Sequence, residues 1–229
     1  MEFEYTGTDN LEVMQKAIHY NAFLISLITG QPRSASDKIL DIGAGIGSFA
    51  EAIRAKGFEV HCLEPDLQQA QLLERKGFTV NTSLDGIADG SFHFMYALNV
   101  LEHIEKDREA LSEWAGKLKK GGRLLIYVPA FNLLYSSMDR KVGHYRRYRK
   151  KQLTEIIESA GLKPVSSARY ADCIGFFVAL LYKLINRKTG DIHEKSLMFY
   201  DRFLFPLSSA GDCFFHHFFG KNVFIVAEK

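Results

Sequence analysis

The sequence is poor in cysteine, and this excludes folds that are held together by disulfides. The 229 residues include only three cysteines, Cys62, Cys173 and Cys213. Because the number is odd and no two of them form a C-x-x-C pair, neither a disulfide framework nor a zinc knuckle is indicated. A reducing compartment fits this usage, and we predict a cytoplasmic location.

Long apolar runs are also missing. The longest, Ile174 to Ile185, contains Lys183 and is shorter than the roughly 20 residues that a membrane helix needs. The start of the chain, MEFEYTGTDN, is acidic and has no apolar stretch behind basic residues, so no secretory signal is indicated. We therefore expect no segment that crosses a bilayer.

An excess of charge of one sign is the third absence. Lys and Arg total 29 against 27 Asp and Glu, which leaves a formal net charge of +2. This balance gives no global reason to bind nucleic acid, so we predict no nucleic-acid partner and expect any basic function to be local. Hydrophobic residues at 47% and charged residues at 24% match an ordinary globular protein.

What the sequence does contain is a regular alternation of short apolar runs with amphipathic segments. Apolar residues recur at near-helical spacing from Leu11 to Ile28, before Gly30 and Pro32. Alternating strands and helices predict a parallel sheet with helices on both faces. The predicted strands cover 38–43, 58–64, 78–83, 91–99 and 123–130, and the predicted helices cover 48–57, 66–77 and 102–122.

The regular alternation ends after these elements. A helix is predicted near 150–161, a strand at 162–170 and a final strand at 222–229, and residues 172–220 hold nine of the 18 phenylalanines. No repeat or low-complexity linker is evident, so we predict a single domain in four parts. These are a helical cap at 1–37, a core at 38–130, a basic lid at 131–151 and an apolar insertion at 172–220 before the last strand.

A glycine loop follows the first predicted strand. In ILDIGAGIGSF, Asp41 ends the strand, and Gly43, Gly45 and Gly47 form the turn into a helix. Glycines let the backbone approach a ligand closely and adopt positive φ there. A dinucleotide fingerprint would require glycine or alanine at position 48, where this chain has Ser48, and this disfavours an NAD-linked oxidoreductase. A purely structural turn in another α/β protein is the remaining alternative.

The spacing G-x-G-x-G, with an acid two residues before it, resembles motif I of the class I S-adenosylmethionine (SAM)-dependent methyltransferases. Glu64 ends the second strand about 20 residues after the glycines, where an acid can accept hydrogen bonds from both ribose hydroxyls. The segment SLDGIADGSFHFMYALNVLEHIEKD is also similar to the family. The resemblance covers 38–130 well, with one departure at His93, where the family usually has aspartate.

The resemblance implies an α/β, Rossmann-like three-layer sandwich with a seven-stranded, mostly parallel sheet. It further implies that SAM is the methyl donor and S-adenosylhomocysteine (SAH) the product. Leu84 and Asp85 would flank the adenine and Asn99 would lie near the methionine moiety. The whole implied donor site is Asp41, Gly43, Gly45, Gly47, Glu64, Leu84, Asp85 and Asn99.

The acceptor side is less explicit. The chain has NVLEH after the fourth strand and not the D/N-P-P-Y/F typical of amine methylation, so a small-molecule acceptor is favoured. VLEHI resembles the quinone-pathway O-methyltransferases, in which an E-x-x-E-H pattern can hold a divalent metal. Because Asn99 occupies the first position, we predict no metal. His103 is a candidate general base or, alternatively, a histidine packed at a helix start.

The stretch GHYRRYRKK places cations between two tyrosines after the fifth strand, on the side of the sheet where ligand sites open. It resembles a G-H-Y-R-R-Y element of a bacterial subgroup of these enzymes. We interpret it as a lid whose arginines could bind an anionic acceptor, with a membrane contact or a solvated helix start as alternatives. The acceptor-side candidates are His103, His144, Tyr145, Arg146 and Arg147, whereas Lys150 and Lys151 are expected to face water.

The phenylalanine-rich insertion is either an extension of the core or the wall of a pocket for a lipid-like acceptor. Its apolar helix beside a basic lid would also suit peripheral docking on an anionic membrane. A non-catalytic SAM-binding regulatory or scaffold subunit is the alternative to an enzyme. The other histidines show no metal spacing and are interpreted as structural: His19, His61, His193, His216 and His217.

Overall fold

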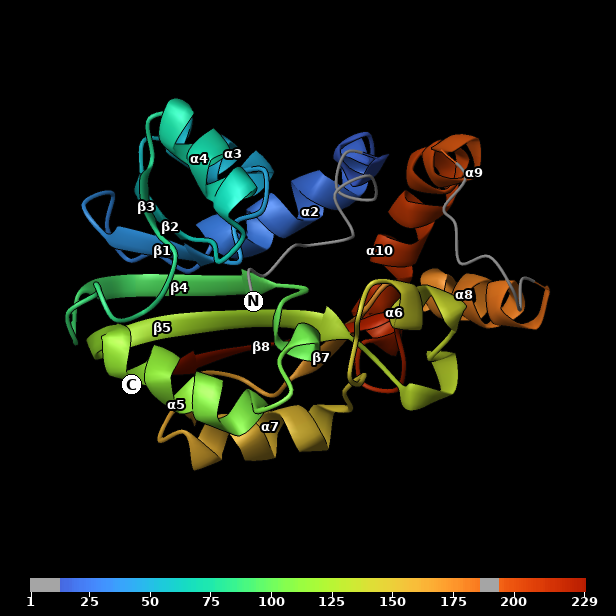
Figure 1. Cartoon of the computed structure of the whole chain (residues 1–229). Coiled ribbons are helices and arrows are strands. Elements are labelled where there is room, and N and C mark those ends of the chain that lie inside the picture. The colour runs from blue at the N-terminus through green and yellow to red at the C-terminus, as the bar shows by residue number, and fades with distance from the viewer. Residues whose placement is uncertain (1–12, 186–193) are drawn as a thin grey trace.

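One mixed sheet of eight strands forms the centre of the computed structural model, which describes residues 13–185 and 194–229 (Figure 1). The strand order is β3-β2-β1-β4-β5-β8-β6, and β7 also pairs with β8. Strands β1 to β5 run parallel, and β8 pairs with its neighbours in the antiparallel sense. The strands are β1 Lys38–Ile42, β2 Glu59–Leu63, β3 Thr79–Asn81, β4 Phe92–Leu98, β5 Leu118–Pro129, β6 Lys163–Pro164, β7 Arg169–Ala171 and β8 Asn222–Glu228.

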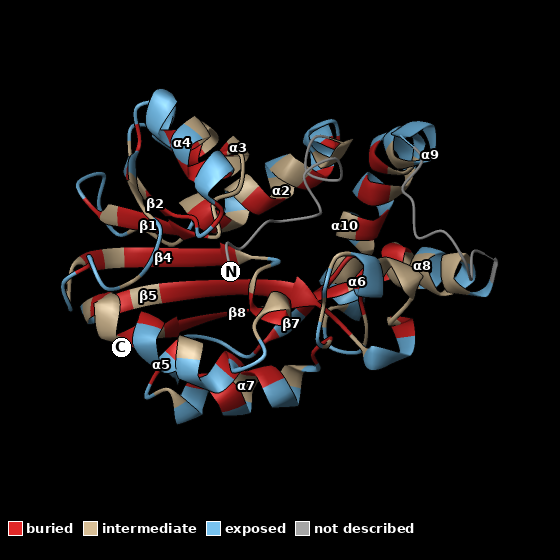
Figure 2. Cartoon of the chain, in the orientation of Figure 1, coloured by how far each residue is buried: buried red, intermediate tan, exposed pale blue. Residues whose placement is uncertain are grey.

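Helices cover both faces of the sheet. On one face lie α2 (Ile18–Thr29), α3 (Ser48–Arg54) and α4 (Leu67–Arg75), and on the other lie α5 (Asp107–Lys117) and α7 (Lys150–Ser159). Each face has its own apolar core, and the central strands between the two cores are buried along most of their length (Figure 2). The α/β, Rossmann-like three-layer fold expected from the sequence is therefore confirmed.

The strand predicted at 162–170 is in fact two short strands, β6 and β7, and this makes eight strands where seven were expected. Both pair with β8, at its two ends. Pro164 has no N–H to donate to a continuous ladder, and the chain returns to β8 through one hydrogen bond from the Val165 N–H to the Val226 carbonyl, 2.9 Å long. The pairing with β8 therefore continues past Pro164, and the interruption falls after Val165, before β7 begins at Arg169.

The helix predicted at 102–122 is shorter than the pattern indicated. It begins with a separate 3₁₀ turn, Leu101–His103, and the α-helix proper ends at Lys117, where β5 starts. The register of β5 against β4 then shifts after the Phe92–Leu118 pair, and the next pair is Phe94–Arg123. The backbone bulges between those pairs, and Gly121 adopts φ of 77° within the bulge.

Further helices gather at the carboxyl ends of the strands (Figure 1). Residues 132–141 contribute a 3₁₀ turn, Asn132–Leu134, and the short helix α6, Ser137–Lys141. The described residues of the predicted apolar insertion fold as α8 (Cys173–Ile185), α9 (Glu194–Phe199), a π-helical turn (Tyr200–Leu204) and α10 (Phe205–Phe215), and His193 lies outside the described residues. The described part of the chain contains no helix long and apolar enough to cross a membrane.

Candidate functional site

The glycine loop lies at the carboxyl end of β1, as the sequence predicted. Gly43, Gly45 and Gly47 have φ of 68°, 57° and 86°, which is backbone that residues with a Cβ rarely adopt. The space is also restricted, because a Cβ on Gly43 would lie 2.6 Å from a methyl of Val100 and one on Gly47 would lie 2.6 Å from a methyl of Leu73. The loop therefore presents bare backbone at this edge of the sheet.

Glu64 connects the second strand to this loop. The Gly45 N–H donates to Oε2 of Glu64 at 2.7 Å, and the Asp66 N–H donates to Oε1 at 3.0 Å. Burial raises the pKa of Glu64, and the two backbone N–H groups oppose the rise. A carboxylate can accept about four hydrogen bonds, so the Glu64 oxygens retain capacity for two ligand hydroxyls.

Asp41 is buried at the end of β1, and its Oδ2 has no hydrogen-bond partner among the described residues. Burial raises the pKa of Asp41 to about 7, and the neighbouring Glu64 carboxylate adds to the rise. The nearby Tyr96 hydroxyl opposes this rise in pKa, but burial dominates, so an ionised Asp41 destabilises the apo fold.

Replacing Asp41 with asparagine should stabilise the apo protein at alkaline pH. The folded-state pKa is raised, so the destabilisation by ionised Asp41 is absent at about pH 4 and complete above about pH 7. The melting temperature of Asp41→Asn should exceed that of the wild type near pH 8, by roughly 2–4 °C for each kcal/mol gained. Equal melting temperatures for the two proteins near pH 8 would show that Asp41 is not destabilised there.

The other predicted donor-site residues lie at the same edge of the sheet. Leu84 and Asp85 follow β3, and Asp85 is exposed and accepts a hydrogen bond from the Ser83 hydroxyl at 3.1 Å. Asn99 comes directly after β4 with φ of 53°, and its N–H donates to the Tyr127 carbonyl at 2.8 Å. The structure brings all these positions to one edge, and their contacts with a donor stay predictions.

Glu102, His103 and His144 form a cluster beside this edge, and their ligand-type atoms all lie within 4.8 Å of one another. The two imidazole centroids are 4.5 Å apart, and Nε2 of His144 lies 3.8 Å from Oε1 of Glu102. On its other side the His144 ring is held by Asp139, with 2.8 Å between Nδ1 and Oδ1. Such a carboxylate behind a histidine is a common arrangement at metal and proton-transfer sites.

The electrostatics of the cluster are unusual. Glu102 is completely buried, and within the described ranges neither carboxylate oxygen has a hydrogen-bond partner. Burial raises its pKa to about 8, although the Arg147 guanidinium opposes the rise. Burial and the nearby His144 lower the pKa of His103 to about 4. A buried carboxyl in this position must be protonated or be neutralised by a cation.

Arg146 and Arg147 are already paired with carboxylates of the protein. Arg147 is buried and makes a two-pronged contact with Asp139, with Nε to Oδ1 at 2.8 Å and Nη2 to Oδ2 at 3.0 Å. Arg146 contacts Asp107 at 2.9 Å and donates to the Glu105 carbonyl at 2.7 Å. The anion-binding role expected for these arginines stays a prediction, and the observed pairs oppose it.

The remaining residues of the basic stretch differ in their surroundings. Tyr145 is 55% exposed, its backbone N–H donates to the Glu102 carbonyl at 2.8 Å, and the Arg146 guanidinium lies 5.8 Å from the centroid of its ring. Lys151 faces water as predicted, whereas Lys150 donates to the His217 carbonyl at 2.9 Å. The stretch thus mainly holds neighbouring segments together at the carboxyl ends of the strands.

A buried polar network around Asp172 was missed by the sequence analysis. Asp172 is a non-glycine residue with φ of 66°, and it accepts hydrogen bonds from the hydroxyls of Tyr200 and Ser208. Its Oδ2 has no partner in the part of the chain that the structure describes. Beside it, burial raises the pKa of Tyr20, whose ring makes an edge contact with that of Tyr127 at 6.3 Å. No motif spacing signals this network.

Known proteins show the same organisation. A family model for a methyltransferase domain matches residues 12–167. The ubiquinone biosynthesis O-methyltransferase of Xanthomonas axonopodis pv. citri (strain 306) is 25% identical over 123 residues, which are 49% of this chain and 52% of that protein. The chain thus spans about half the length of this curated relative.

Two solved structures illustrate the likeness in fold. A SAM-dependent methyltransferase from Archaeoglobus fulgidus aligns over 93% of this chain and 94% of its own, with a TM-score of 0.62 and 20% identity. Geranyl diphosphate C-methyltransferase from Streptomyces coelicolor A3(2) aligns over 90% of this chain and 75% of its own, with a TM-score of 0.63 and 15% identity.

Proposed function

Because the chain belongs to the methyltransferase domain family, we propose that it transfers the methyl group of SAM to a hydroxyl of a small or lipid-like acceptor. The observation that carries this proposal is the cluster of Glu102, His103 and His144 directly after β4, at the edge that holds the glycine loop. A hydroxyl must lose its proton as it is methylated, and a histidine of this cluster would take it.

The donor would lie along the glycine loop. Glu64 would accept hydrogen bonds from the ribose hydroxyls, because both of its oxygens are held in place by the backbone N–H groups of Gly45 and Asp66. The in-line displacement needs little covalent chemistry from the protein, so positioning of donor and acceptor would supply much of the rate. His103 would be the proton acceptor, since its lowered pKa keeps the imidazole neutral at physiological pH.

Replacing Glu64 with alanine should weaken SAM binding by roughly 10-fold to 150-fold, because about 1.5–3 kcal/mol is lost with charged hydrogen bonds. Calorimetric titration with SAM measures the change. Glu59, an exposed acid at the start of β2, provides a matched control, and its replacement with alanine should leave the affinity unchanged. If SAM binds Glu64→Ala as tightly as it binds the wild type, the donor lies elsewhere.

As an alternative to the proton-transfer role of His103, the cluster offers ligands for a divalent cation, whereas Asn99 in the sequence predicted no metal. Glu102 offers two oxygens that have no hydrogen-bond partner among the described residues, and each histidine offers a nitrogen. A cation bound there would supply a positive charge that lowers the pKa of an acceptor hydroxyl. The third ligand-type group, His144, comes from a distant segment, which is why the spacing of VLEHI did not indicate it.

Addition of Mn²⁺ should therefore raise the melting temperature of the wild type in a saturable manner, because a ligand that binds only the folded state stabilises it. Glu102→Gln removes the charge but keeps the shape of the side chain, and it should abolish this shift. A melting temperature that does not respond to Mn²⁺, Mg²⁺ or Zn²⁺ would contradict the cation site and leave the proton-transfer role of His103 intact.

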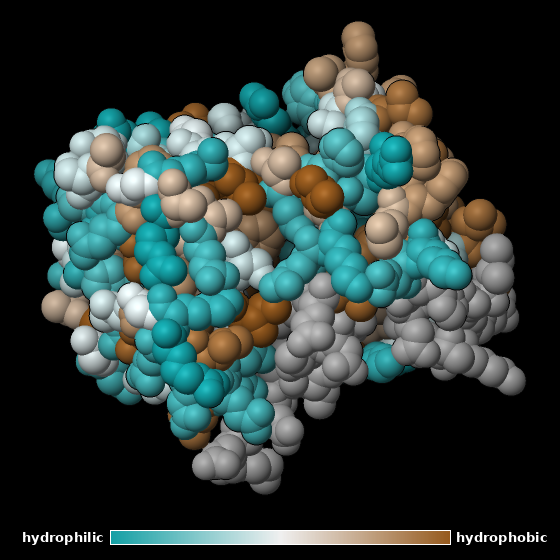
Figure 3. All heavy atoms as spheres, turned by 90° about the horizontal axis from the view of Figure 1, so that it is seen from above, coloured by the Kyte–Doolittle hydropathy of each residue, from teal (hydrophilic) through white to brown (hydrophobic). Residues whose placement is uncertain are grey.

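The lipid-like character of the acceptor is supported by the surface of α8 to α10. Large apolar side chains are exposed along these helices, and in Figure 3 apolar atoms gather at the end of the molecule that they form. Membrane-surface helices bury such side chains at the boundary between headgroups and acyl chains. The most exposed of this group are Phe177, Leu181, Leu184, Phe199, Phe203, Leu207, Phe214 and Phe218.

Replacing Phe214 and Phe218 together with serine should reduce binding to vesicles that contain anionic lipid by roughly 10-fold or more. Burying one phenylalanine side chain in the membrane contributes a free energy of about 1.5–3 kcal/mol. Vesicle sedimentation measures the bound fraction. Leu67→Ser changes an exposed leucine on α4, far from this surface, and should have no effect. Equal binding of all three proteins would contradict a membrane-facing role.

A further inference from the structure

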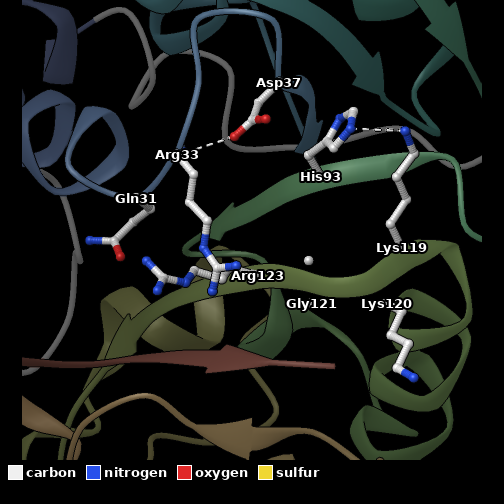
Figure 4. Close-up of a pocket in the computed structure, with 9 residues that line it drawn as sticks. Gln31, Arg33, Asp37, His93, Lys119, Lys120, Gly121 and Arg123 are labelled. Carbon is white, nitrogen blue, oxygen red and sulfur yellow. Dashed lines mark hydrogen bonds between the residues drawn. The ribbon is translucent and has the colours of Figure 1, made fainter.

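A pocket lies at the opposite edge of the sheet from the glycine loop, at the amino ends of β1 and β4 and the start of β5 (Figure 4). Its volume is about 160 Å³, whereas a single buried water needs only about 10–15 Å³. Its lining is strongly basic. The residues that line it are Gln31, Arg33, Asp37, His93, Lys119, Lys120, Gly121, Gly122 and Arg123.

His93 has more hydrogen-bond donors facing it than it can satisfy. The Lys38 backbone N–H donates to Nδ1 at 2.9 Å, and the Lys119 Nζ lies 2.9 Å from Nε2. A neutral imidazole has only one nitrogen able to accept, and an ammonium has no lone pair. Whichever ring nitrogen carries the proton, one of these contacts brings two N–H groups together. Because the Lys38 backbone N–H can only donate, we assign the imidazole proton to Nε2.

With this assignment the Nε2–H of His93 and the ammonium of Lys119 point toward each other, and no acceptor for either is seen among the described residues. An anion beside them would accept from both and remove the conflict. The long lysine side chain can turn to such an anion, because it is only partly buried. His93 is also the position at which the sequence departs from the family that it resembles, because that family usually has aspartate there.

Further positive charge lies across the bulge at Gly121. Figure 4 shows the guanidiniums of Arg33 and Arg123 together on one side and the His93–Lys119 pair on the other. Glu228 contacts both arginines, at 2.5 Å and 3.4 Å. Asp37 is also present, but its Oδ2 accepts from two backbone N–H groups at 2.7 Å and 3.2 Å. Because the single carboxylate of Glu228 is shared between Arg33 and Arg123, their combined charge is only partly neutralised, and positive charge faces the pocket.

We propose that this pocket binds a small phosphate-bearing anion, whose oxygens accept hydrogen bonds from His93 and Lys119. Arg33 and Arg123 face it from the other side and contribute charge. A phosphate group matches this arrangement better than a carboxylate, because it presents several oxygens in different directions and carries more charge. The bulge of glycines, Gly121 and Gly122, keeps the floor of the pocket free of side chains.

Titration with inorganic phosphate tests this site. We expect saturable binding to the wild type in calorimetry at an ionic strength held constant with sodium chloride. Lys119→Ala and His93→Asn should each weaken it roughly 10-fold or more through loss of a charged hydrogen bond. The asparagine oxygen can still accept from the Lys38 N–H, so this variant keeps the fold. Lys56→Ala, an exposed lysine after α3, is the matched control and should bind phosphate normally.

A second measurement separates the pocket from the donor edge. Saturating SAH should leave the phosphate affinity unchanged, because the glycine loop lies at the other end of the strands. The proposal is overturned if phosphate gives no saturable binding, if SAH displaces it, or if Lys119→Ala and His93→Asn both bind it like the wild type.

Discussion

Replacing His103 with alanine should lower kcat by roughly 10²–10⁴-fold, the usual contribution of a positioned general base. The affinity for SAM should stay within a few-fold of the wild type, because the donor contacts lie at the glycine loop and Glu64. Burial and the nearby His144 lower the pKa of His103 to about 4, so the imidazole is unprotonated at neutral pH, and as a weak base it would take the proton only as the methyl group is transferred. Turnover is measured by SAH formation with phenolic and lipid hydroxyl acceptors.

The same prediction has a pH signature. A base with an ordinary histidine pKa, about 6.5, would lose activity below neutral pH. The lowered pKa of His103 means that its proton-accepting form persists to about pH 5. His61→Ala provides a control, because this histidine pairs with Glu59 on β2, away from the site. Full turnover by His103→Ala on an acceptor that the wild type methylates would contradict the role of His103.

Replacing Arg147 with alanine should destabilise the fold by about 3–5 kcal/mol, because it leaves the buried Asp139 without its two-pronged partner. For a chain of this size that corresponds to a fall in melting temperature of roughly 10 °C. Although burial opposes it, hydrogen bonds from His144 and Arg147 hold the pKa of Asp139 well below its usual range. The loss should therefore be large at neutral pH, where Asp139 is ionised.

Arg146→Ala is the matched control for this change. Arg146 is more exposed than Arg147 and its ion pair with Asp107 is a single contact, so its loss should cost clearly less. Urea denaturation of the two variants gives the comparison. If Arg147→Ala is as stable as the wild type but fails to use its acceptor, Arg147 binds the acceptor and the earlier anion-lid interpretation is correct.

The sheet and the glycine loop could be predicted from the sequence because both have local signals. Strand and helix periodicity lies within single segments, and the positive φ of Gly43, Gly45 and Gly47 requires glycine at those positions. Glu64 also follows from topology, since the ends of neighbouring parallel strands meet at one edge. The division of β6 from β7 was not predicted, because it depends on how two separate parts of this segment pair with the distant strand β8.

The surroundings of the acceptor-side residues could not be predicted in the same way. His144 meets Glu102 only because the segment after β5 folds back over the tip of β4. From the sequence, Arg147 was predicted to bind an anionic acceptor, and only the structure shows that its guanidinium is paired with Asp139. The pairing of His93 with Lys119 joins β4 to the bulge of β5, which no spacing rule indicates. Contacts between distant segments decide whether a charge is available to a ligand.

Calorimetric titration of the purified protein with SAM and, separately, with NAD⁺ tests the central claim most directly. The glycine loop followed by Ser48, with Glu64 held by the Gly45 N–H, predicts saturable binding of SAM with one site for each chain and no binding of NAD⁺. Saturable binding of NAD⁺ without binding of SAM would contradict the assignment of this edge of the sheet as a methyl-donor site.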